Sequence, residues 1–73
     1  MTLFIIILFL KKSAEQGYAI AQYSLGIMYY YGEATEQNLQ EALYWFHKSA
    51  QQGYKASIDM IKKLEQHIYS VNQ

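Results

Sequence analysis

Apolar residues recur at intervals of three and four positions through most of this chain, as they do on the buried stripe of an amphipathic helix. The first such segment spans about residues 19–31 and ends at Gly32; its apolar positions are Ala21, Leu25, Met28 and Tyr29. The second spans about residues 39–52 and alternates small and large residues at Ala42, Trp45, Phe46, Ser49 and Ala50. The third spans about residues 55–70 through Ile58, Ile61, Leu64, Ile68 and Val71. The pattern therefore predicts three helices joined by short turns.

The N-terminal segment has no such alternation, because Leu3 to Leu10 is an unbroken apolar run. Eight residues are too few to span a bilayer, which needs about twenty. No basic residue precedes the run, and Lys11 and Lys12 stand where a signal peptide would carry its small cleavage-site residues. We expect a helix that is buried or faces a partner. A short strand, favoured by three consecutive β-branched Ile residues, a cleaved signal and membrane contact remain alternatives.

A short phrase occurs twice, as KKSAEQGY at residues 11–18 and as HKSAQQGY at residues 47–54. The two copies are 36 residues apart and agree at six of eight positions. In each copy a Lys in the last helical turn is followed by Gly17 or Gly53, and Gly is the residue that most often ends a helix with positive φ. We interpret the phrase as a repeated helix end, onto which Tyr18 or Tyr54 can fold back.

The same shift of 36 residues places residues 3–16 on the helix predicted at 39–52, with Phe9 and Leu10 on Trp45 and Phe46. The correspondence fails at Phe4 and Ile5, which fall on Gln40 and Glu41, so this first helix is apolar on all sides.

Two local signals refine the predicted helices. Asn38 is a candidate N-cap, and Glu41 stands in capping-box position three residues later. Gly26 lies in a helix interior, where it costs roughly 1 kcal/mol relative to Ala. We expect a bulky ring of the next helix to approach it closely.

The segment from Ala19 to Gly53 resembles the Sel-1-like repeat, a relative of the tetratricopeptide repeat with somewhat longer units. The matching signature positions are Ala21, Leu25, Gly26, Tyr29, Gly32, Ala42, Trp45, Phe46, Ala50 and Gly53. The loop departs from the family, because it lacks a second Gly and a Val before Asn38. The resemblance implies an all-α solenoid of about four helices in a single domain, residues 1–73. Residues 18–53 would be one full repeat, 2–17 part of a preceding repeat, and 54–73 a terminal capping helix, since Lys62 replaces a repeat Gly.

The resemblance implies a protein–protein interaction scaffold or adaptor that binds a protein or peptide on its helical surface, as a segment of a longer array. Relatives act in bacterial host interaction and in eukaryotic protein degradation. Tyr23 and Tyr30, seven residues apart on one helix face, are candidate partner contacts, and packing against a neighbouring repeat is the alternative for them. Phe4 and Ile5 are candidate contacts in the apolar run. Self-association through residues 3–10 and membrane anchoring by this segment are further alternatives.

The net charge and the reactive side chains argue against nucleic-acid binding, metal binding and enzymatic activity. The 73 residues carry six Lys, no Arg and six acidic residues, and this zero net charge disfavours nucleic-acid binding. The chain has no Cys, and His47 and His67 lack metal-ligand spacing, so we expect no metal and no cofactor. A β-lactam-related hydrolase, suggested by cysteine-rich relatives, is a distant alternative because no Ser is followed three residues later by Lys. We expect no enzyme. The sequence does not determine the cellular compartment, although it slightly favours the cytoplasm over export.

Overall fold

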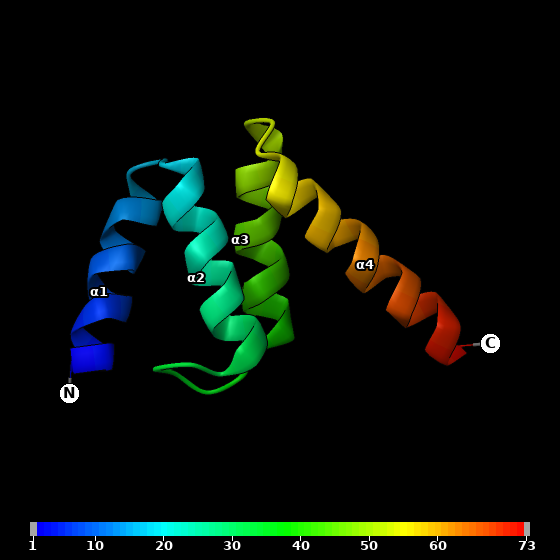
Figure 1. Cartoon of the computed structure of the whole chain (residues 1–73), viewed down its shortest axis with the longest axis horizontal. Coiled ribbons are helices and arrows are strands. Elements are labelled where there is room, and N and C mark those ends of the chain that lie inside the picture. The colour runs from blue at the N-terminus through cyan, green and yellow to red at the C-terminus, as the bar shows by residue number, and fades with distance from the viewer. Residues whose placement is uncertain (1, 73) are drawn as a thin grey trace.

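The computed structural model describes the backbone of residues 2–72 and the side chains of residues 4–66. This part of the chain forms four α-helices: α1 Thr2–Glu15, α2 Ala19–Tyr31, α3 Leu39–Gln51 and α4 Lys55–Asn72. The first three lie side by side with alternating direction, and α4 slopes away from α3, so the two termini lie at opposite ends of the long axis (Figure 1). Helix α2 packs between α1 and α3, and α4 packs on α3. The all-α solenoid predicted from the sequence is confirmed.

The N-terminal run is helical from Thr2, so the alternative of a short strand is wrong. Ile7 and Ala14 face α2 and are buried, whereas most of the other apolar side chains of α1 are exposed. This follows from the sequence, because a helix that is apolar on all sides can bury only the stripe that meets its neighbour. The side chains of His67, Ile68 and Val71, for which the sequence also makes predictions, lie outside the described residues.

The repeated phrase ends two helices in the same way, as predicted. Gly17 and Gly53 have φ angles of 101° and 85°. Tyr18 N donates to the Ser13 carbonyl at 3.4 Å, and Tyr54 N donates to the Ser49 carbonyl at the same distance. The glycine N–H groups donate to the carbonyls of Ala14 and Ala50, at 3.0 and 2.8 Å. Both pairs of bonds are those of a Schellman motif.

The loop between α2 and α3 is fastened to the end of α2. Asn38 caps α3, since its Oδ1 accepts a hydrogen bond from Glu41 N at 3.1 Å. Only this half of the predicted capping box forms, because Asn38 N donates to the Tyr29 carbonyl at 2.9 Å. Gln37 Nε2 donates to the Tyr30 carbonyl at 2.8 Å. Ala34 takes a φ of 61° in this loop, a left-handed conformation that is uncommon outside glycine.

The core consists of two clusters related by the 36-residue shift. In the first, Ile7, Leu10 and Ala14 of α1 pack on α2. In the second, the corresponding residues Leu43, Phe46 and Ala50 of α3 pack against α4. The residues on the opposite side of each interface also correspond. Leu25 and Met28 of α2 lie 36 positions before Ile61 and Leu64 of α4. The chain therefore contains the same helix–helix interface twice.

Candidate protein-binding surface

The largest exposed apolar area lies on α1. Within the described residues, five of the ten exposed large hydrophobic side chains belong to this helix. Four of them, which we call the α1 surface, are more than half exposed: Phe4, Ile5, Leu8 and Phe9. Both α1 residues predicted to contact a partner, Phe4 and Ile5, belong to this surface, at 60% and 65% exposure. A contiguous apolar surface of this kind is typical of a binding site, whereas single exposed apolar residues are common on any protein.

For two of the exposed side chains of α1, Phe9 and Ile6, the equivalent helix α3 shows the structural cause of the exposure. Trp45 is 6% exposed, whereas the corresponding Phe9 is 71% exposed. Ala42 is fully buried, whereas the corresponding Ile6 is 41% exposed. In α3 this side is covered by α2, whose Ala19 carbonyl accepts a hydrogen bond from Ser49 Oγ at 2.9 Å. Helix α1 thus corresponds in sequence to α3, but no helix of the described residues covers it on this side.

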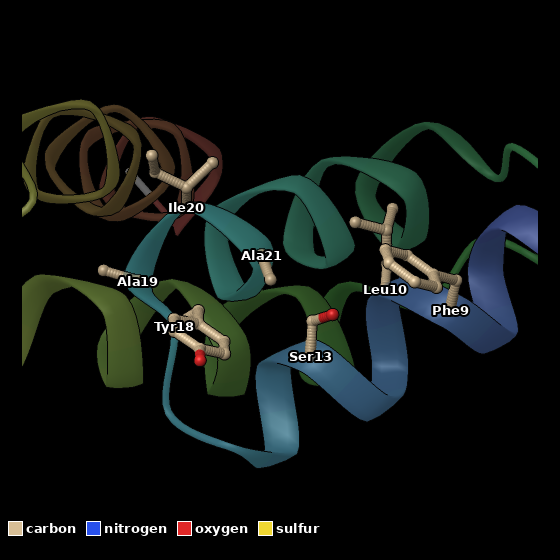
Figure 2. A pocket seen from close by; sticks show the side chains of 7 residues that line it. All are labelled: Phe9, Leu10, Ser13, Tyr18, Ala19, Ile20 and Ala21. Atoms are coloured by element: carbon tan, nitrogen blue, oxygen red, sulfur yellow. The ribbon is translucent and has the colours of Figure 1, made fainter.

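An open groove of about 520 Å³ runs along α1 and the start of α2. Figure 2 shows its lining: Phe9, Leu10 and Ser13 come from α1, and Tyr18, Ala19, Ile20 and Ala21 come from the connection and the first turn of α2. The walls are almost entirely apolar. Tyr18 is 63% exposed at the edge of the groove. The groove therefore combines an apolar floor with an exposed aromatic rim.

The two candidate tyrosines of α2 lie elsewhere. Tyr23 is half-buried, with its ring centroid 5.9 Å from that of Phe46 and 5.4 Å from that of Tyr54. Tyr30 is half-buried, meets Tyr31 edge-on at 4.8 Å, and borders a shallow hollow of about 290 Å³ toward α4. Both rings pack on the second core cluster. The structure thus shows neighbour packing for both, and a partner contact by either remains a prediction.

The repeat signature residues occupy the contacts between helices. Six of them are buried, namely Ala21, Leu25, Gly26, Ala42, Trp45 and Phe46. Tyr29, Gly32 and Ala50 are half-buried, and Gly53 is exposed at the turn. Gly26 lies against the Phe46 ring, which is the close approach expected from the sequence.

A polar connection that the sequence analysis missed joins three helix ends. Gln22 is only 4% exposed, and its Nε2 donates to the Ala14 carbonyl at 3.1 Å. Gln52 Nε2 donates to Gln22 Oε1 at 3.0 Å and to the Gly17 carbonyl at 2.7 Å. The available signal was the place of Gln22 directly after Ala21 on the buried stripe, where a polar side chain needs a partner.

Comparison with known proteins identifies the architecture. The model of the Sel1 repeat family matches residues 7–18 and 19–54. The chain belongs to the Sel1 repeat family. Two sel1-like repeat-containing proteins of Acanthamoeba polyphaga mimivirus are 49% identical over 45 residues and 43% identical over 44 residues. A crystal structure of a Sel1 repeat protein from Oxalobacter formigenes has a TM-score of 0.69 and 41% sequence identity. The resemblance inferred from the residues is thereby confirmed.

The relatives are much longer than this chain. The matches cover 62% and 60% of the chain but only 8% of each mimivirus protein. The match to the Oxalobacter structure covers 70% of the chain and 15% of that protein. The described residues thus form a short stretch of Sel1 repeats, a helical repeat fold. As for membrane anchoring, none of the helices within residues 2–72 has the length and hydropathy needed to cross a bilayer.

Proposed function

We propose that the chain is a protein–protein interaction module of the Sel1 type, one segment of a longer array, whose α1 surface binds a protein or peptide partner. The observation that carries the proposal is the exposure of Phe4, Ile5, Leu8 and Phe9, at 51% to 71%, on one helix of an otherwise packed repeat. Removing such side chains from water on binding contributes about 25 cal/mol per Å² of apolar area. The proposal assigns the chain no reaction and no cofactor.

The chemistry of the surface favours an apolar partner over a charged one. A hollow of about 470 Å³ beside the α1 surface is lined by Ile5, Leu8 and Phe9, with Lys11, Lys12 and Glu15 at its edge. An apolar centre with charged residues at the rim is the usual anatomy of a protein interface. The formal net charge of zero supplies no basic stripe for nucleic acid. Tyr30, with the hollow beside it, is proposed as a secondary contact, and Tyr23 as a contact through the part of its ring that is not packed.

The test selects binders and then removes the surface. A phage-displayed library of helical peptides is panned on the immobilised chain, and enriched peptides are measured against the wild type and against the double variant Phe4→Gln/Ile5→Glu. The variant introduces the residues that stand at the corresponding positions of α3, Gln40 and Glu41, so a helix is expected to form. We expect at least tenfold weaker binding to the variant. Peptides that bind both proteins equally would contradict the proposal.

Two further readouts separate the remaining occupants of the α1 surface. If the chain floats with phosphatidylcholine vesicles and the double variant does not, the α1 surface binds a membrane instead of a protein partner. Light scattering during size exclusion reports self-association, in which the partner is a second copy. Neither readout depends on a selected peptide, so each alternative can be recognised when the library yields none.

A further inference from the structure

The hollow beside Tyr30 lies away from α1, between the end of α2 and the middle of α4. Helix α4 slopes away from α3 toward its C-terminus, so it diverges from the end of α2 (Figure 1). The hollow has a volume of about 290 Å³ and is lined by Tyr30 and Tyr31 of α2 and by Met60, Lys63 and Leu64 of α4. Both walls come from helices of this chain, so α2 and α4 together set its shape.

The lining of this hollow combines apolar and polar groups, unlike the almost wholly apolar groove along α1. Leu64 is buried and Met60 is half-buried, and they supply the apolar part. Lys63 is exposed, and no other described residue that lines the hollow is charged. Its ammonium group donates hydrogen bonds and accepts none, and a Tyr hydroxyl can donate as well. The hollow therefore favours an occupant that carries a negatively charged acceptor close to an apolar group.

The two tyrosines form an aromatic wall that is partly fixed before anything binds. Their rings meet edge-on, with the centroids 4.8 Å apart. Tyr30 is half-buried because it packs on the second core cluster, whereas Tyr31 is 63% exposed. Since the core holds one ring and that ring supports the other, little side-chain freedom is lost on binding. Tyr combines a large contact area with a polar tip and is frequent among the residues that dominate binding energies.

Acidic residues near the hollow do not occupy it. Asp59 precedes Lys63 by four positions on α4, and Glu33 follows Tyr31 by two positions, but neither residue lines the hollow. A pair of opposite charges at four-residue spacing on an exposed helix contributes only about 0.2–0.5 kcal/mol. Lys63 can therefore exchange Asp59 for the carboxylate of a partner at little cost.

The volume of the hollow suits side chains of a partner better than a free small molecule. Pockets for small ligands are typically about 300–1,000 Å³ and enclose most of the ligand. At about 290 Å³ and shallow, this hollow falls at the lower end of that range. Tyr, Lys and apolar side chains around a shallow depression are the composition of a peptide contact, in which one or two side chains supply the specificity.

We propose that the hollow binds an acidic side chain, Asp or Glu, together with a large apolar side chain within four positions of it in a segment of a partner protein. Over this range two side chains can reach the same side of an extended or helical segment. The carboxylate lies at Lys63 and the tyrosine hydroxyls, and the apolar side chain lies on Met60. The inference rests on the proposed function, because it names the chemistry of the protein segment that is bound at the secondary contact beside Tyr30.

The test selects peptides on a chain whose α1 surface is altered. A random phage-displayed library is panned on the Phe4→Gln/Ile5→Glu variant, so enrichment reports the other surfaces. Displayed peptides are fused to the coat protein at their C-terminus, so the only carboxylates offered are those of side chains. Enriched peptides are then measured against the wild type and against Lys63→Glu by fluorescence anisotropy. We expect at least about tenfold weaker binding to Lys63→Glu. A peptide whose acidic residue is replaced with Lys should recover binding to this variant.

Matched controls make the result specific to the hollow. Lys55→Glu makes the same change of charge at an exposed residue in the first turn of α4, and it should leave the affinity unchanged. Tyr31→Ser should weaken binding several-fold, whereas Tyr44→Ser, which removes a ring of α3 that is 51% exposed, should not. Circular dichroism verifies that each variant keeps its helices. With ¹³C-methyl methionine, the Met60 signal should shift on binding and that of the buried Met28 should stay in place.

Three results would overturn the inference: no enriched peptide, enriched peptides without an acidic residue, or equal affinity for the wild type and Lys63→Glu. The proposed function of the α1 surface is tested separately, by panning on the wild type. If those peptides fail to distinguish the Phe4→Gln/Ile5→Glu variant while a peptide dependent on Lys63 is found, the α1 surface is removed from the proposal and the hollow stays. The opposite pair of results leaves the α1 surface standing and removes only the hollow.

Discussion

A Cβ atom added to Gly26 of α2 would lie 2.6 Å from Cε1 of Phe46 in α3, closer than two carbon atoms can approach. Phe46 is fully buried, so its ring can make room only if the side chains packed around it also shift. The absence of a side chain at position 26 therefore sets the separation of the two helices. In α4 the corresponding residue is Lys62, which has a long side chain where α2 has none.

Replacing Gly26 with Ala is expected to destabilise the protein, although Ala in a helix interior normally gains about 1 kcal/mol over Gly. Overpacking against a fixed ring costs about 1–3 kcal/mol, so the net free energy of unfolding should fall. Urea denaturation followed by circular dichroism measures the change. In a Phe46→Leu background the same substitution should be neutral or stabilising, because the ring is gone. If Gly26→Ala were more stable than the wild type, the Phe46 ring would be able to move aside at little cost.

At Ser57, in contrast to Gly26, substitution by Ala is expected to stabilise the protein. It is fully buried in α4, and its Oγ has no hydrogen-bond partner among the described residues. The corresponding residue of α2 is Ala21, which occupies the same kind of contact without a hydroxyl. We expect Ser57→Ala to raise the free energy of unfolding by about 1 kcal/mol, since a buried hydroxyl without a partner keeps its desolvation cost. A lower melting temperature for Ser57→Ala would show that this hydroxyl does have a partner.

Local chemistry made the helix ends predictable from the sequence. The Lys-Ser-Ala-x-Gln-Gly-Tyr phrase contains the residues that close a helix, and both copies form the same hydrogen bonds. The close approach at Gly26 was also predictable, because a glycine inside a helix lowers its stability and is favoured there only where a neighbouring element needs the space. These features depend on a few neighbouring residues, so one sequence is enough to recognise them.

The arrangement on the two faces of the repeat was not predictable in the same way. Helix α1 has no polar face, so its pattern could not indicate that Ile7 and Ala14 are buried while Phe9 is exposed. Tyr23 and Tyr30 share a spacing of seven, but that spacing does not reveal that Tyr54, from a later turn, packs on Tyr23. Such contacts join residues about thirty positions apart, and their geometry follows from the packing of whole helices.

Ser49 and Ser13 are equivalent in sequence but differ in their surroundings. Ser49 is fully buried and donates to the Ala19 carbonyl, whereas Ser13 is half-buried at the open groove. We expect Ser49→Ala to lower the free energy of unfolding by about 1 kcal/mol. Ser13→Ala should change it by less than about 0.5 kcal/mol, as is usual away from buried contacts. Thermal unfolding of both variants measures the two changes. Equal losses of stability would contradict the open side of α1, where Ser13 has no covering helix among the described residues.

The last prediction concerns association of the chain with itself. If the α1 surface pairs two copies, the apparent molar mass should exceed the 8.6 kDa of the single chain and rise with concentration. Phe4→Gln/Ile5→Glu should return the mass to that of the monomer, because the pair would otherwise bury two charged and two polar groups without partners. Light scattering during size exclusion measures this, with Glu65→Gln on the exposed side of α4 as a control that should change nothing. A mass that stays above the monomer in the double variant would place the interface elsewhere. A monomeric wild type would instead leave the α1 surface free for a different protein.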